Sequence, residues 1–502
     1  MTPTPAATAP TATIFGHPRG LATLFFTEFF ERYSYYGMRA LLVLFLTASV
    51  AKGGLGVSAL TAGAIYGLYT STAYLCAVPG GWIADRLIGQ QRSVWYGGIL
   101  IAIGNFMLAV PAGNFFYFGL VVTALGTGLL KPNVSAIVGE LYVGQAGARR
   151  DAAFSIFYMG INLGAWASPL LSGTIGETLS YRFGFFTVGV AMLVGLVQYR
   201  LTAHHLGDAG RVPRDTTPAE RSRSGWILLA GSVVVAALVA LVATGVVQVT
   251  ATQLAWFAER FMYAIGIAFF GGVLLFGKLD GVARRRVLVI IAFTLCGALF
   301  WAGFEQAGST LNLFARDLTD RSLGGSMFTA HEHPATWYQS VNSIFIFILS
   351  PFFAWFWITL GRRNLDPAAP LKFGLGLILL GLGFAVLIFA AKLIIADGGK
   401  VGPQWLMLTY LLHTCGELCL SPIGLSNITK LAPPRYASQM MGMWFLGTAL
   451  GNLAAGQIGC RIGSDVSTMP AEFLQMTLYA VGVGLLMLVL SPLLRRWMGG
   501  IR

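Results

Sequence analysis

The sequence predicts an all-α protein that crosses a membrane many times. Of its 502 residues, 56% are hydrophobic and 11% are charged, whereas soluble domains carry about 25% charged residues. Apolar windows of about 20 residues, the length that spans a bilayer, recur along the whole chain. Basic residues gather in every second connection between these windows. These observations predict a polytopic membrane protein of about 14 transmembrane helices.

The apolar windows are spread evenly over the sequence. They lie near residues 21–50, 58–82, 93–111, 115–140, 152–174, 183–200, 226–246, 255–277, 287–310, 337–360, 371–395, 404–429, 438–460 and 472–494. The stretch before them, 1–20, is rich in Thr, Ala and Pro and has neither a basic n-region nor an apolar core. We therefore expect a disordered cytoplasmic tail there and not a signal peptide.

The most hydrophilic connection, 204–224, divides the windows into six before it and eight after it. Symmetric transporters often pack two six-helix halves. We therefore expect one six-helix bundle over 21–203 and a second over 287–502. The segment 204–286 is predicted to be a cytoplasmic linker that carries two inserted, peripheral transmembrane helices.

The basic residues fix the predicted orientation. With a cytoplasmic N-terminus, the inward connections hold paired cations such as Arg149 with Arg150 and Arg362 with Arg363, while the outward ones hold only scattered cations. This asymmetry follows the positive-inside rule. Both termini are therefore predicted to be cytoplasmic, and the net charge of +13 reflects topology and not a nucleic-acid partner.

The first apolar window carries ionisable residues, namely Glu28, Glu31, Arg32 and Arg39. An ionised side chain at membrane depth costs at least a few kcal/mol and persists mainly where it faces a wet cavity and has a partner. Helical periodicity places Glu28, Arg32 and Arg39 on one face, so this helix is predicted to line a site. The structural alternative is a simple Glu28–Arg32 pair at i,i+4, which leaves Glu31 and Arg39 unexplained.

Further polar residues interrupt later windows of the first half. Lys131 lies at mid-membrane beside Pro132 and needs an anionic partner, for which Glu28 or Glu31 is the candidate. Asn162 lies between Gly160 and Gly164, whose spacing permits close helix approach. Packing alone explains these glycines but does not require the asparagine.

These motifs resemble the proton-coupled oligopeptide transporters, the POT or peptide transporter family within the major facilitator superfamily. The resemblance covers both halves of the chain in the correct order. Two departures are Tyr33, where phenylalanine is usual, and Ser343, where proline is common. The matching motifs are Glu28-Phe-Phe-Glu31-Arg32-Tyr33-Ser-Tyr35-Tyr36-Gly37, Lys131-Pro132-Asn133, Phe157-Tyr158-x-x-Ile161-Asn162-x-Gly164, Phe304-Glu305-Gln306, Gln339-Ser-x-Asn342, Glu417-x-x-x-Ser421-Pro422 and Met440-Met-Gly-x-Trp444.

The resemblance implies a fold and an activity. The fold is the major facilitator fold of two six-helix bundles, here with two extra helices between them. The activity is proton-coupled import of short peptides, di- and tripeptides, by alternating access in the plasma (inner) membrane of a prokaryote. Protons would be the coupling ion, with no other cofactor, no metal and no enzymatic reaction, and the protein would function as a monomer in the lipid bilayer.

The resemblance also implies roles for single residues. Arg39 is expected to receive the peptide carboxylate, because a guanidinium stays charged and can bind two oxygens. Glu417 is expected to pair with the peptide amino group, and Glu305 to be a protonatable partner of Arg39 at the substrate site. The residues expected to bind the peptide backbone or line the pocket are Asn162, Asn342, Tyr36, Tyr74, Trp301, Ser421 and Trp444. Those expected to couple protons are Glu28, Glu31, Arg32, Lys131 and Glu305.

The distribution of deep charges supports a dipolar substrate independently of the family. Cations exceed acids in the first half, whereas the second half contributes Glu305 and Glu417. The alternatives are proton-coupled carriers of other small anionic or zwitterionic solutes: nitrate, an amino acid or a peptide-like drug. Glu417 argues against nitrate, which has no cationic group. An enzyme is disfavoured because His331-Glu332-His333 lies in an external connection, and Cys415 with Cys419 lacks the further ligands of a metal site.

Overall fold

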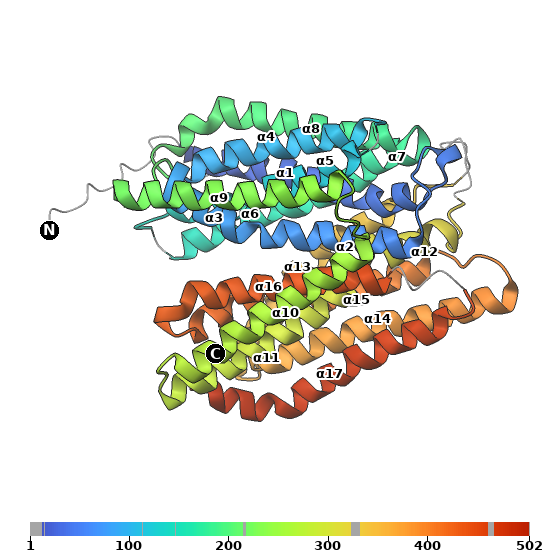
Figure 1. The fold of residues 1–502 in the computed structure, drawn as a ribbon. Coiled ribbons are helices and arrows are strands. Elements are labelled where there is room, and N and C mark those ends of the chain that lie inside the picture. Colours follow the sequence, from blue (N-terminus) through green and yellow to red (C-terminus); the bar gives the residue numbers. More distant parts are fainter. Residues whose placement is uncertain are drawn as a thin grey trace. The chain divides into compact units, whose positions relative to one another are not determined.

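The computed structural model describes the chain over most of its length (Figure 1). The described residues are 13–14, 16–112, 114–145, 147–213, 217–322, 332–459 and 466–500. They are almost entirely helical, and every predicted apolar window overlaps a helix. The exceptions are a two-stranded antiparallel hairpin, β1 (Thr13–Ile14) with β2 (His17–Pro18), and isolated bridges in the connections. The predicted all-α class is confirmed.

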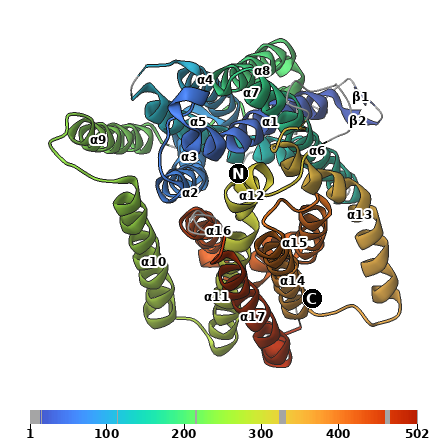
Figure 2. The ribbon, with the colours of Figure 1, turned by 90° about the vertical axis from the view of Figure 1, so that its right-hand side faces the viewer.

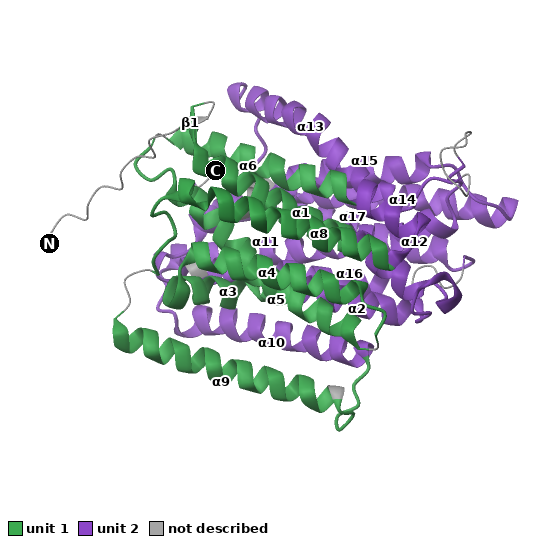
Figure 3. Cartoon of the chain, turned by 90° about the horizontal axis from the view of Figure 1, so that it is seen from above, with its two compact units in different colours: residues 1–38, 75–168, 182–250 green, residues 39–74, 169–181, 251–502 purple. Residues whose placement is uncertain are grey.

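Contacts divide the chain into two compact units, which we describe separately (Figure 3). Unit 1 comprises residues 1–38, 75–168 and 182–250, and unit 2 comprises residues 39–74, 169–181 and 251–502. Helix α1 (Arg19–Thr47) is continuous, and the division falls within it, between Met38 and Arg39.

The remaining helices of unit 1 follow in chain order. They are α3 (Ala77–Ile83), the π-helical turn η2 (Ala84–Ile88), α4 (Gln90–Ala109), α5 (Phe115–Glu140), α6 (Gly147–Ser168), α8 (Tyr181–Thr202), the 3-10 turn η4 (Ala203–Leu206) and α9 (Pro218–Ala243).

Unit 2 holds most of the second half of the chain and two segments of the first half. Its helices are η1 (Val50–Lys52), α2 (Ala59–Leu75), η3 (Pro169–Gly173), α7 (Thr174–Thr178), α10 (Ala251–Phe276), α11 (Gly281–Phe304), η5 (Glu305–Gly308), α12 (Thr310–Asp317), α13 (Trp337–Arg362), α14 (Ala369–Asp397), α15 (Gln404–Leu431), η6 (Pro434–Tyr436), α16 (Ala437–Gly459) and α17 (Met469–Met498).

The helices have the dimensions of membrane spans. Among the described residues, ten helices are long and apolar enough to cross a membrane by length and composition. Helix α1 is not among them, because every 18-residue stretch of it holds more than two charged residues. Its charges instead find partners inside the protein, as described below. The chain is therefore a multi-pass membrane protein.

The two units do not follow the boundaries expected from the sequence. By their contacts, α2 and residues 169–181 belong to unit 2, although both precede the linker at 204–286. Each unit consists of segments that contact one another, whereas the predicted boundaries followed chain order alone. The division into bundles at 21–203 and 287–502 therefore stays a prediction.

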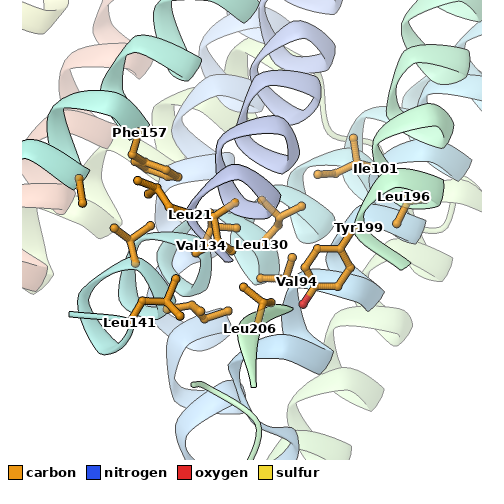
Figure 4. Packing of buried hydrophobic residues seen from close by; sticks show 14 of the residues in the cluster. Leu21, Val94, Ile101, Leu130, Val134, Leu141, Phe157, Leu196, Tyr199 and Leu206 are labelled. Atoms are coloured by element: carbon orange, nitrogen blue, oxygen red, sulfur yellow. The ribbon is translucent and has the colours of Figure 1, made fainter. Parts of the chain in front are cut away.

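The core of unit 1 lies between α1, α4, α5, α6 and α8 (Figure 4). Helix α5 presents Leu130, Val134, Ile137 and Leu141, spaced so that they share one face. Leu24 of α1 is fully buried in the same cluster. This packing fixes the part of α1 that carries its first charged residues.

The connection between α3 and α4 is largely helical. The chain stays helical through Ile88 and reverses at Gly89, whose φ of 82° is in the region that favours glycine. The start of α4 and the end of α5 both bind Gly210: Gln91 N donates to Gly210 O at 2.9 Å, and Gly210 N donates to Glu140 Oε2 at 2.6 Å.

Part of the tail expected to be disordered is ordered. Residues 1–12 and 15 lie outside the described residues, but β1 pairs with β2, and residues 16 and 17 contact Arg149 and Tyr142. His17 Nδ1 lies 2.7 Å from the Tyr142 hydroxyl, and the Arg149 guanidinium donates to the Gly16 carbonyl. Burial raises the pKa of Tyr142 to about 12, so its hydroxyl stays protonated. These contacts stabilise an order that composition alone did not indicate.

Glycines allow the helices of unit 2 to approach closely. A Cβ atom on Gly456 of α16 would lie 2.3 Å from the Gly63 carbonyl oxygen and 2.6 Å from the Gly67 nitrogen of α2. A Cβ atom on Gly374 of α14 would lie 2.8 Å from the Gly484 carbonyl oxygen of α17. Glycine at these positions therefore permits close packing of α2 on α16 and of α14 on α17.

Little of either inserted helix is buried. None of the apolar window of α9 is buried, and only 11% of that of α10 is. Within unit 2, α10 packs on α16 and α11 (Figure 2). Both helices are peripheral within their units, as expected.

We predict that Gly456→Ala destabilises the protein. The added methyl group meets backbone atoms of α2, which cannot rotate away, and overpacking of this kind costs roughly 1–3 kcal/mol. The matched control is Gly482→Ala on α17, where a Cβ atom would have no neighbour within 4 Å. Thermal unfolding of the purified variants measures the difference. Equal unfolding temperatures for both variants would contradict the close approach of α2 and α16.

Candidate functional site

In unit 1, the first part of α1 carries a buried charge cluster. Glu28, Glu31 and Arg32 are 2%, 1% and 3% exposed. Arg32 Nε lies 3.2 Å from Glu28 Oε1 and also pairs with the Glu31 carboxylate. The i,i+4 spacing places Glu28 and Arg32 one above the other on the helix. One guanidinium therefore serves two carboxylates, and the simple two-residue pair is not sufficient to describe the cluster.

The other expected residues of unit 1 lie on α1, α5 and α6. Lys131 of α5 lies within the electrostatic range of Glu28, in agreement with the partner expected from the sequence. Asn162 is buried and its amide donates to the Tyr158 carbonyl of its own helix at 3.0 Å. Tyr36 is half-buried and its ring meets the Tyr35 ring edge-on at 5.3 Å. The roles expected for Lys131, Asn162 and Tyr36 remain predictions.

In unit 2, the second part of α1 forms a long-range ion pair. Arg39 Nη1 lies 3.2 Å from Glu305 Oε2, and both side chains are buried. Glu305 comes directly after the end of α11, where the chain tightens into η5. The pair expected from the sequence between these two residues is present.

Tyr66 of α2 adds a third member to this ion pair. Its hydroxyl donates to the Glu305 carbonyl oxygen at 3.0 Å and approaches Glu305 Oε2 at 3.4 Å. A Cβ atom on Gly308 would lie 2.3 Å from the Tyr66 hydroxyl oxygen, so glycine there makes room for the ring. The Tyr66 hydroxyl thus contacts both the backbone carbonyl and the carboxylate of Glu305.

A second polar group joins α13 and α15. The Asn342 amide donates to Glu417 Oε2 and to Thr414 Oγ1, both at 3.0 Å. Thr414 and Glu417 share one face of α15 because they are three residues apart. The Glu417 carboxylate lies within the electrostatic range of both Arg39 and Glu305. The two polar groups therefore belong to one buried site.

Four more residues of unit 2 were expected to line the pocket. They are Trp301 of α11, Ser421 of α15, Trp444 of α16 and Tyr74 of α2. The Trp301 indole nitrogen and the Ser421 hydroxyl are buried and have no hydrogen-bond partner among the described residues. The Trp444 ring fills the space left by Gly297 and Gly424 and packs on Phe373. Tyr74 is half-buried on α2.

Sequence reasoning missed Tyr66, Thr414 and Glu177. The Glu177 carboxylate accepts the backbone N–H groups of Ala335 and Thr336 at 2.9 and 2.8 Å. Thr336 is the N-cap of α13, and a carboxylate is favourable beside the positive end of a helix. No motif or spacing marks these three residues, since each acts on a segment far away in the sequence.

The connection that contains His331-Glu332-His333 is a packed loop over its described residues. His331 lies outside the described residues. Glu332 pairs with Arg321 at 2.7 Å and with Lys400 at 3.0 Å, and these cations hold the pKa of Glu332 below its usual range. The His333 ring contacts the Arg321 carbonyl and the Tyr338 hydroxyl, and its burial lowers the pKa of His333. Within the described ranges, no three His, Cys, Asp or Glu residues are grouped to hold a metal.

A buried, charged site inside a multi-pass helical protein is typical of a membrane transporter, and comparison with known proteins agrees. The sequence model of the POT family matches residues 91–463. Peptide transporter YePEPT of Yersinia enterocolitica subsp. palearctica is 40% identical over 497 residues, which cover 97% of this chain and 96% of the relative. The di-/tripeptide transporter of Lactococcus lactis subsp. cremoris is 36% identical over 504 residues, 98% of both chains.

Solved structures give the same result. The crystal structure of peptide transporter POT in complex with sulfate superposes with a TM-score of 0.91 at 41% identity and covers 98% of both chains. The chain belongs to the POT family of transporters. The family expected from the motifs and the major facilitator fold that it implies are confirmed.

We predict that Tyr66→Phe destabilises the protein, because Glu305 loses its hydrogen bond from the Tyr66 hydroxyl. The change removes one hydroxyl that bonds a charged residue, and such hydrogen bonds contribute roughly 1.5–3 kcal/mol. The matched control is Tyr96→Phe on α4, whose side chain is 50% exposed. Thermal unfolding of both variants measures the effect. If Tyr66→Phe unfolds at the wild-type temperature and transports normally, the hydroxyl does not position Glu305.

Proposed function

We propose that this protein is a proton-coupled symporter that imports di- and tripeptides by alternating access. The observation that carries the proposal is the buried Arg39–Glu305 pair with Glu417 in its electrostatic range. One cation and two acids in one buried site suit a substrate that carries both charges. The relatives named peptide transporter and di-/tripeptide transporter support the choice of substrate.

The chemistry of the site suits the termini of a peptide. The Arg39 guanidinium can bind both oxygens of a carboxylate in a fork. Glu417 is an acceptor for an ammonium group, and Asn342 holds its carboxylate in place. The buried Trp301 and Ser421 groups can hydrogen-bond a substrate backbone. Because these groups address the termini and the backbone, side chains of different size can be accepted.

Other expected residues take supporting parts in the proposal. Asn162 offers an amide to the peptide backbone, and aromatic side chains adapt to variable apolar groups. The aromatic residues assigned to the pocket wall are Tyr36, Tyr74, Trp301 and Trp444.

Coupling follows from competition for Arg39. While Glu305 is ionised, it needs the arginine as its partner, because a lone carboxylate at membrane depth is costly. When Glu305 takes up a proton, that need disappears and Arg39 becomes available to the peptide carboxylate. Protonation and peptide binding then favour each other, as linkage requires.

The cluster of unit 1 supplies a second set of groups for proton coupling. Glu28, Glu31, Arg32 and Lys131 combine two acids with two cations. Coupled acids titrate as a group, so a proton taken up by one changes the charge balance of the others. We assign this cluster to proton uptake or release together with Glu305.

The proposal includes the setting of the protein. It resides in the plasma (inner) membrane with both termini in the cytoplasm, since the paired arginines of alternate connections then lie inside. It works as a monomer, with protons as its coupling ion and without a metal, another cofactor or an enzymatic reaction. Carriage of nitrate is disfavoured because Glu417 would repel an anion.

The proposal is tested by uptake into liposomes that contain the purified protein. We expect an inward proton gradient to drive accumulation of a labelled dipeptide, because pH and membrane potential both act on the bound proton. Unlabelled dipeptides and tripeptides should compete, whereas single amino acids and nitrate should not. Accumulation that persists after an ionophore collapses both gradients rules out proton coupling.

Replacing Glu305 with glutamine tests the coupling step. Glu305→Gln resembles the protonated state, so it should still exchange peptide at equal concentrations on both sides but should not concentrate it under a proton gradient. The control is Glu259→Gln, an acid on the inserted helix α10. Near wild-type accumulation by Glu305→Gln would move the coupling step to Glu28, Glu31 and Lys131.

A further inference from the structure

A second polar site lies in unit 2, away from the residues discussed so far. A cavity of about 920 Å³ lies where α13 and α15 end, α14 begins and α17 ends. Four basic residues line it, and Asp366 is the one acid among its described lining residues. The four are Lys372 of α14, Lys430 of α15 and Arg495 and Arg496 of α17.

Asp366 already forms an ion pair within the cavity. Lys372 Nζ lies 2.7 Å from Asp366 Oδ1 and 4.4 Å from the centre of the Trp357 ring. Neither Arg495 nor Arg496 forms an ion pair or side-chain hydrogen bond with a described residue. Arg495 and Arg496 therefore give the cavity positive charge beyond the Lys372–Asp366 pair.

The first turn of α14 adds to this positive potential. Ala368 and Ala369 line the cavity, and alanine at the N-cap supplies no side chain to bind the first backbone N–H groups. The N-terminus of a long helix is favourable for an anion. Pro370 has no N–H group and the Leu371 N–H donates to the Ala368 carbonyl at 2.9 Å, so the converging cations are the observation that indicates an anionic ligand.

The surroundings of the cavity are apolar and open. Leu365, beside the cavity, is 63% exposed, and Leu493, beside lining residue Pro492, is also exposed. The second half of α13, residues 350–362, contains no fully buried residue. Figure 2 shows α13 at the edge of unit 2. A ligand with an apolar part can therefore contact these helices while its anionic part occupies the cavity.

We propose that this cavity binds the phosphate head group of an anionic phospholipid from the cytoplasmic leaflet. Basic pockets between the cytoplasmic ends of transmembrane helices bind such head groups, and a cavity of this size is in the range of small-ligand sites. Lys430, Arg495 and Arg496 contact the phosphate, and the acyl chains lie on the exposed apolar residues of α13 and α17. The lipid ties together α14, α15 and α17, of which α15 also carries Glu417.

The test uses the full-length protein, purified in detergent and freed of lipid. Phosphatidylglycerol, phosphatidylcholine or inorganic phosphate is added, and native mass spectrometry and thermal unfolding report binding and stabilisation. The cavity variant is Lys430→Gln, Arg495→Gln and Arg496→Gln combined. The control, Arg223→Gln, Arg284→Gln and Arg285→Gln combined, removes the same charge from exposed residues that do not line the cavity.

We expect the wild type to bind phosphatidylglycerol at least tenfold more tightly than phosphatidylcholine. Since each cation near an anionic membrane surface contributes about 1 kcal/mol, the cavity variant should bind phosphatidylglycerol about 100-fold more weakly. The control variant should bind like the wild type.

Three results would overturn the proposal. Equal binding of the two lipids by the wild type excludes an anionic head-group site, whatever the stability of the variants. Equal losses in the cavity and control variants assign the preference to general charge. Complete displacement of phosphatidylglycerol by an equal concentration of inorganic phosphate assigns the cavity to a small anion and not to a lipid.

Discussion

The structure depends on one constraint: each charged side chain within a membrane span needs an interacting partner inside the protein. Helix α1 carries two acids and two arginines within a span, and an isolated charge at that depth is strongly unfavourable. Arg32 is satisfied within its own helix by Glu28 and Glu31. Arg39 pairs with Glu305, which comes from a distant part of the sequence. Packing around α1 must therefore bring the end of α11 to this helix.

An ion pair within one helix and an ion pair between two segments differ in how easily their members can change partners. A pair within one helix persists whenever the helix forms, so it contributes to the span and resists exchange. A pair between α1 and η5 depends on the positions of two segments, and either member can find another partner. Tyr66 and the Asn342 amide then hold the carboxylates of Glu305 and Glu417 in place while partners change. This separation of fixed and exchangeable charges is the physical basis of the proposed coupling.

Close helix packing is the second constraint. Lipid tails are as apolar as leucine, so helices in a membrane associate through small residues that allow close contact and many van der Waals interactions. The chain has 63 glycines, and those between α2 and α16 or between α14 and α17 leave no room for a Cβ atom. Where helices end and such packing stops, cavities with charged walls form, as at the junction of α13, α14, α15 and α17.

The sequence by itself determined the helical class, the position of each span and the local Glu28–Arg32 pair, because apolar length and i,i+4 spacing are properties of neighbouring residues. The resemblance of its motifs to the peptide transporter family also implied the Arg39–Glu305 pair. Only the tertiary structure decided that Tyr66 holds Glu305, that Thr414 joins Asn342 and Glu417, that Glu177 binds the start of α13 and that residues 13–18 pack on Tyr142. It also placed α2 and residues 169–181 in unit 2. Such contacts join distant segments, and the periodicity of a helix states which face is polar but not which helix lies opposite it.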